Sequence, residues 1–87
     1  MSDPVPITIC RRNPCELCED ALETIESVAE AADVEVAIEQ IDVDSDPDLR
    51  ERYGETVPVV YVDGTKQFEL FVDETVLLGA LQDASEE

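Results

Sequence analysis

The order of apolar patterns along these 87 residues constrains the fold more than any other feature of the sequence. Alternating apolar positions typical of strands occupy 5–10, 34–43, 57–62 and 66–71. Helical spacing occupies 15–32 and 73–84, and Ser45-Asp46-Pro47 starts a short helix between them. A right-handed crossover makes the first two strands parallel, and the tight turn at Asp63-Gly64 makes the last two antiparallel. We therefore predict one α/β domain over 1–87, with a four-stranded mixed sheet and helices on both faces.

Two details of this prediction concern single segments. The apolar phase shifts between Ile38 and Ile41, which predicts a bulge or a partly paired edge in the second strand. The tail 83–87 is polar, and we expect it to fray.

The net charge of −18, from 23 acidic and five basic residues, is extreme for this length. Acidic residues recur along the whole chain between apolar positions, which argues against disorder and favours an acidic surface. Such a surface resembles that of proteins from salt-accumulating halophiles, with an acidic face for a basic partner as the competing interpretation. It argues against nucleic-acid binding, and the lack of a long apolar run or leader pattern favours a cytoplasmic protein with no membrane association.

Cys15 and Cys18 carry the chemistry that the sequence predicts. They are three residues apart at the start of a predicted helix, so they can form a small disulfide. The positive end of the helix favours the thiolate form of Cys15, with Arg11 and Arg12 just upstream. The acidic residues of the first turns, Glu16, Glu19 and Asp20, oppose that effect. The pattern predicts that Cys15 attacks a disulfide and that the deeper Cys18 resolves the product.

These residues and a later segment together resemble a known family. Cys15-Glu16-Leu17-Cys18 after a strand, followed by Thr56-Val57-Pro58 before a strand and hairpin, is similar to the glutaredoxin family of the thioredoxin fold, over nearly the whole chain. The resemblance implies a βαβαββα fold and a cis Pro58 facing the cysteines. It also implies that Val57 and Pro58, with Thr56 before them, form the segment that offers backbone to a bound peptide or glutathione. Arg12 would help to hold the glutathione carboxylate, and Asp73 matches the acidic residue near the last helix.

The function that the resemblance implies is thiol–disulfide exchange. We expect an enzyme that reduces protein or small-molecule disulfides, with electrons from a small thiol or from a thioredoxin reductase system. We expect a monomer with no resident cofactor and no metal, and with glutathione or another low-molecular-weight thiol as co-substrate. The family usually has Pro-Tyr between the cysteines, and this chain has Glu16-Leu17.

Two other functions compete with this interpretation. Cys10-x4-Cys15-x2-Cys18 reproduces three ligands of a plant-type iron–sulfur loop, so an iron–sulfur or zinc binding or carrier protein is one of them. The chain has no fourth cysteine and no histidine, so that site would need another ligand. The second is a non-catalytic thioredoxin-fold interaction module. Cys10 ends an apolar strand, and its simplest interpretation is a small core residue.

Overall fold

A computed structural model describes residues 4–12 and 15–85 of the chain. It contains four strands, three α-helices and one 3₁₀ turn in the predicted order. Along the chain these are β1 (Val5–Arg11), α1 (Glu16–Ala31), β2 (Val36–Asp42), η1 (Val43–Ser45), α2 (Pro47–Tyr53), β3 (Val59–Val62), β4 (Thr65–Glu69) and α3 (Glu74–Ser85). Within the described ranges, no helix is both long enough and apolar enough to cross a membrane.

The four strands form one mixed sheet in the order β2-β1-β3-β4. β1 pairs in parallel with β2 from Val5↔Val36 to Arg11↔Asp42, and it pairs antiparallel with β3 on its other side. β3 and β4 form the antiparallel hairpin. The predicted mixed sheet is therefore confirmed, with β1 and β3 at its centre and β2 and β4 at its edges.

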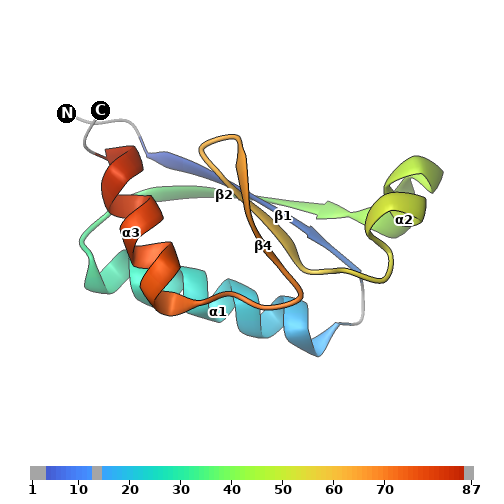
Figure 1. Ribbon diagram of the computed structural model, residues 1–87, viewed down its shortest axis with the longest axis horizontal. Coiled ribbons are helices and arrows are strands. Elements are labelled where there is room, and N and C mark those ends of the chain that lie inside the picture. The colour runs from blue at the N-terminus through green and yellow to red at the C-terminus, as the bar shows by residue number, and fades with distance from the viewer. Residues whose placement is uncertain (1–3, 13–14, 86–87) are drawn as a thin grey trace.

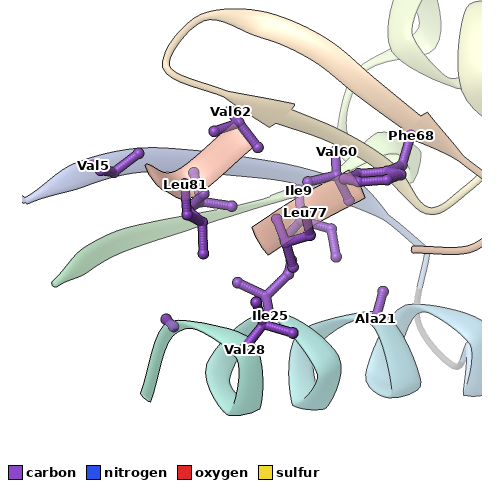
Figure 2. Close-up of a cluster of buried hydrophobic side chains, with 12 residues drawn as sticks. Val5, Ile9, Ala21, Ile25, Val28, Val60, Val62, Phe68, Leu77 and Leu81 are labelled. Atoms are coloured by element: carbon purple, nitrogen blue, oxygen red, sulfur yellow. The ribbon is translucent and has the colours of Figure 1, made fainter. Parts of the chain in front are cut away.

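Helices cover the two faces of the sheet unequally. α1 and α3 lie together on one face, where Figure 2 shows their apolar side chains meeting those of β1 and β3. The buried residues of this main core are Val5, Ile7, Ile9, Ala21, Ile25, Val28, Ala29, Val60, Val62, Phe68, Leu77 and Leu81. α2 lies at one end of the molecule (Figure 1), where Leu49 and Tyr53 pack against a second cluster. That cluster comprises the buried residues Cys10, Cys18, Val43, Val57 and Val59.

The apolar phase shift in β2 has a physical cause that needs no bulge. Ile38 packs against the main core, whereas Ile41 packs against the second cluster, so the two side chains serve different cores. β2 pairs with β1 without interruption, so no bulge forms. β2 is an edge strand, paired on one side only, which was the other expected alternative. The register shift of this sheet lies between Val60 and Tyr61 of β3, a position that the sequence did not indicate.

Most segment ends differ from the prediction by one or two residues, and three of them have a clear reason or consequence. β3 begins at Val59 because Val57 and Pro58 form a loop ahead of the ladder. β4 ends at Glu69, where Leu70 takes a φ of 73° that breaks the extended backbone. The last helix continues to Ser85, beyond residue 83 where we expected fraying, and 86–87 lie outside the described residues.

Candidate redox site

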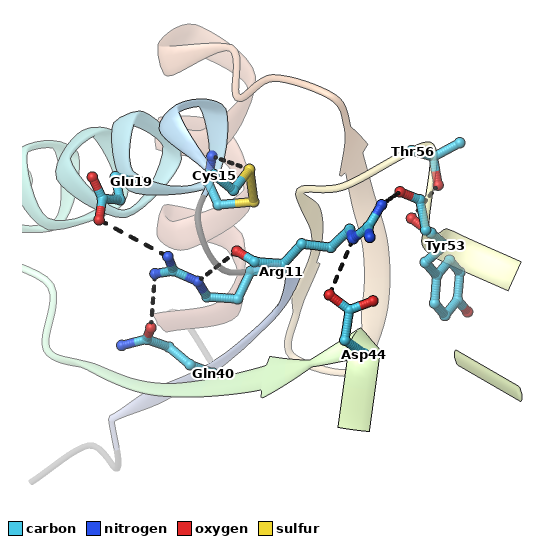
Figure 3. The surroundings of a disulfide bond; sticks show 10 residues. Arg11, Cys15, Glu19, Gln40, Asp44, Tyr53 and Thr56 are labelled. Carbon is cyan, nitrogen blue, oxygen red and sulfur yellow. Dashed lines mark hydrogen bonds and ion pairs between the residues drawn. A yellow bond between two sulfur atoms is a disulfide. The ribbon is translucent and has the colours of Figure 1, made fainter. Parts of the chain in front are cut away.

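Cys15 and Cys18 lie together at the start of α1 and are joined by a disulfide (Figure 3). Cys15 is the N-cap residue, with extended backbone at φ −155°, and the N–H of Cys18 donates a hydrogen bond to Cys15 Sγ over 3.1 Å. The two Cα atoms are 5.2 Å apart. Cys18 is fully buried, whereas Cys15 is partly exposed. Of the two cysteines, Cys15 is therefore the one that reaches solvent.

The loop before β3 lies against this pair. The Val57–Pro58 peptide bond is cis, as the resemblance implied. Val57 belongs to the same buried cluster as Cys18, and Cys15 packs against that cluster. The N–H of Leu70 donates to the carbonyl oxygens of Thr56, at 3.2 Å, and Pro58, at 2.9 Å. The loop is thus fixed from the segment after β4 and placed beside the cysteines.

Both arginines ahead of the cysteines form hydrogen bonds and ion pairs with other residues of the chain. Arg11 donates to Gln40 Oε1 over 3.2 Å, and its Nη2 lies 4.0 Å from Glu19 Oε1. Arg12 donates from Nε to Asp44 Oδ2 over 3.2 Å and from Nη1 to the Gly54 carbonyl over 3.3 Å. Figure 3 shows Glu19 and Asp44 on opposite sides of Cys15. The positive charge expected near Cys15 is therefore largely paired.

Asp73 has a local structural role. Its Oδ1 accepts hydrogen bonds from the N–H groups of Thr75, at 2.9 Å, and Val76, at 3.1 Å. This is helix N-capping, which satisfies donors that a helix start otherwise leaves unpaired. Among the described residues, Asp73 forms no hydrogen bond with Cys15 or Cys18. Its expected part in substrate binding stays a prediction.

Cys10 is the third cysteine and lies inside the second cluster. It is a reduced thiol, and burial raises its pKa above the ordinary value. Low exposure and a disfavoured thiolate make it unreactive, which agrees with a packing role. No set of three or more His, Cys, Asp or Glu side chains in the described ranges is arranged to hold a metal ion.

Sequence reasoning missed two tyrosines next to this cluster. The hydroxyl oxygens of Tyr53, at the end of α2, and Tyr61, in β3, are 2.9 Å apart. This hydrogen bond, with a smaller contribution from burial, raises the pKa of Tyr61 to about 12. The residues are eight positions apart across a loop, so no periodicity relates them. Asp44 and the Gly54 carbonyl were missed for the same reason.

Large apolar side chains are exposed near the site. Leu17, between the two cysteines, is 52% exposed, and Phe71 is 68% exposed. Leu70 is also exposed, and its N–H holds the Pro58 carbonyl, which places it beside the loop. Exposed apolar residues near the disulfide provide a surface that another apolar chain can cover.

The comparisons with known proteins agree with this geometry. An X-ray structure of a structural-genomics target protein from X. campestris, XcR50, is 28% identical, with a TM-score of 0.71 over 90% of this chain and 97% of that one. A mutant thioredoxin from Halobacterium salinarum is 27% identical, with a TM-score of 0.62 over 98% and 78% of the two chains. Protein Ne2328 from Nitrosomonas europaea, at 23% identity and a TM-score of 0.76 over 93% and 95%, shares the fold.

These likenesses establish the α/β thioredoxin-like fold. No curated protein gives a significant match to the sequence. The sequence profile of the family described as Glutaredoxin-like domain (DUF836) matches residues 6–82, which is most of the chain. With the fold and the Cys15–Cys18 pair, that match shows that the chain belongs to the glutaredoxin-like domain family of the thioredoxin superfamily.

Proposed function

We propose that this protein is a thiol–disulfide oxidoreductase that reduces disulfides through Cys15 and Cys18. The observation that carries the proposal is the asymmetry of the pair: a partly exposed cysteine at the start of a helix is bonded to a fully buried one. Backbone N–H groups and the helix dipole favour a thiolate at Cys15 in the reduced protein. An exposed thiolate with a second thiol held against it is the arrangement that disulfide exchange requires.

The reaction proceeds in two exchanges. The Cys15 thiolate attacks one sulfur of the substrate disulfide, the substrate S–S bond breaks, and the other substrate sulfur leaves as a thiolate that takes up a proton. Cys18, deprotonated, then attacks Cys15 Sγ and releases the second substrate thiol, which leaves the Cys15–Cys18 disulfide. Two electrons pass from the cysteine pair to the substrate. A dithiol reductant of the cell returns them by the reverse exchange.

Two features favour a polypeptide as the substrate. The backbone N–H and carbonyl of Val57 make no hydrogen bond with any other described residue, so they can pair with an extended chain. The exposed side chains of Leu17, between the cysteines, and of Leu70 and Phe71, in the segment bonded to the Val57–Pro58 loop, offer apolar contact. A small, polar disulfide would use neither feature fully.

The test is reduction of insulin disulfides in molar KCl, with dithiothreitol as electron donor. Cys15→Ser should abolish the reaction, because no other exposed thiolate can start it. Cys18→Ser should accumulate a mixed disulfide on Cys15, visible by mass spectrometry without reductant. Cys10→Ala is the matched control, since Cys10 is buried and takes no part in either exchange. A Cys15→Ser variant with full activity would end the proposal.

A further inference from the structure

Asp44 holds two cations at the end of the molecule that carries the disulfide. It lies in η1, and its side chain is 34% exposed. Oδ2 is 3.2 Å from Arg12 Nε, and Oδ1 is 3.6 Å from Arg50 Nε. Arg12 is fixed a second time by the Gly54 carbonyl. One carboxylate thus joins a guanidinium that follows β1 to a guanidinium of α2.

An anion that approaches Cys15 therefore meets cations that already have partners. Arg12 is three residues from Cys15 and holds Asp44, while Arg11 lies against Glu19. Lys66 is paired with Glu69 in β4. Arg52, in the last turn of α2, is the basic residue that enters no ion pair within the described part of the chain. With a net charge of −18 around them, these pairs leave little positive potential for a substrate carboxylate.

We infer that Asp44 is a specificity-determining residue: it is an internal anion that occupies Arg12 and Arg50 and so disfavours disulfides that carry carboxylates. This inference rests on the proposed function, which it restricts to neutral or basic polypeptide disulfides. It also alters the expectation that Arg12 holds the glutathione carboxylate. A substrate carboxylate can bind Arg12 only by displacing the Asp44 carboxylate. The displaced Asp44 then loses its partner and repels the substrate carboxylate.

The test is a binding measurement that needs no thiol exchange. S-methylglutathione carries two carboxylates, and its thioether cannot react with a disulfide. It is titrated by calorimetry into the oxidised protein, at the lowest KCl concentration that preserves native circular dichroism. Asp44→Asn should bind it about two- to fivefold more tightly than the native chain, since exposed ion pairs contribute about that factor. The gain should shrink as KCl is raised, because salt screens the exposed guanidinium groups.

Controls separate this effect from the general loss of one negative charge. Asp48→Asn makes the same charge change in α2, at a carboxylate that forms no ion pair among the described residues, and should give little gain. Arg12→Gln combined with Asp44→Asn should lose the gain. Asp44→Ser is a second neutral replacement at this exposed position, so the test does not depend on one variant folding.

Three results would overturn the inference: no gain in Asp44→Asn and Asp44→Ser, an equal gain in Asp48→Asn, or a gain that survives Arg12→Gln. None of them bears on the redox proposal, whose failure appears instead as full activity of Cys15→Ser. In an active enzyme, Asp44→Asn should also raise the rate ratio of glutathione disulfide to the uncharged bis(2-hydroxyethyl) disulfide. An unchanged ratio would likewise count against the inference.

Discussion

Tyr53 and Tyr61 are the two tyrosines of the chain, and they form one side-chain hydrogen bond that joins α2 to β3. Both pack against the cluster that contains Cys10 and Cys18. The hydrogen bond with Tyr53, together with burial, favours the protonated form of Tyr61 and raises its pKa to about 12. A raised folded pKa means that the contribution to stability is complete below the unfolded value of about 10 and is lost as pH rises through about 12.

Tyr53→Phe should therefore lower the pKa of Tyr61 toward about 10, the ordinary tyrosine value. The variant has a single tyrosine, so its tyrosinate absorbance follows Tyr61 alone during an alkaline titration. In the native chain, one of the two tyrosines should ionise with a midpoint near 12. Tyr61→Phe is the reciprocal control, and circular dichroism must show that each variant stays folded through the titration. A midpoint that stays near 12 in Tyr53→Phe would contradict the assigned cause.

At the scale of elements, α2 is the helix least tied to the rest of the fold. None of its seven residues is buried, whereas α1 buries Cys18, Ala21, Ile25, Val28 and Ala29. Its contacts with the second cluster are the half-buried Leu49 and Tyr53, and Arg12 reaches the carbonyl that follows it. Local opening costs little free energy where few apolar contacts are lost. α2 can therefore open while the main core stays intact.

Hydrogen exchange followed by mass spectrometry should detect this difference. Peptides from α2 should exchange well before peptides from α1 or β1, because opening α2 leaves the main core unbroken. Tyr53→Phe should accelerate exchange in α2 and leave α1 unchanged, which makes α1 the internal reference. Equal protection of α1 and α2 in the native chain would show that α2 is held by more than these contacts.

What the sequence could predict follows from the range of the interactions. Local periodicity predicted three features that the structure confirms: the order of elements, the helix α1 that begins at the cysteines, and the edge position of β2. The Arg12–Asp44 pair joins residues 32 positions apart and depends on where η1 lies relative to the end of β1. No periodic pattern encodes such a pair. Asp73 was expected at the substrate, and the structure shows that its side chain also caps α3, a local role that the sequence analysis did not assign to it.

At the scale of the whole molecule, repulsion between carboxylates is the largest unbalanced interaction. The chain has 23 acidic residues and five basic ones, and the ion pairs of the described residues engage only Glu19, Asp44 and Glu69. The remaining carboxylates share a molecule whose Cα radius of gyration is 12.6 Å. At 0.01 M salt the Debye length is about 30 Å, so charges on opposite sides repel one another. At 1 M it is about 3 Å, and only adjacent charges interact.

Thermal stability should therefore rise steeply with KCl. Melting followed by circular dichroism from millimolar to molar KCl should show a large increase in Tm, with loss of structure at the lowest concentrations, because unfolding relieves repulsion that salt would otherwise screen. Trehalose at matched osmolality is the control: it is excluded from protein surfaces but carries no charge, so it should reproduce only a small part of the increase. If the circular dichroism spectrum and Tm stay the same across the KCl series, repulsion between carboxylates does not limit the stability of this protein.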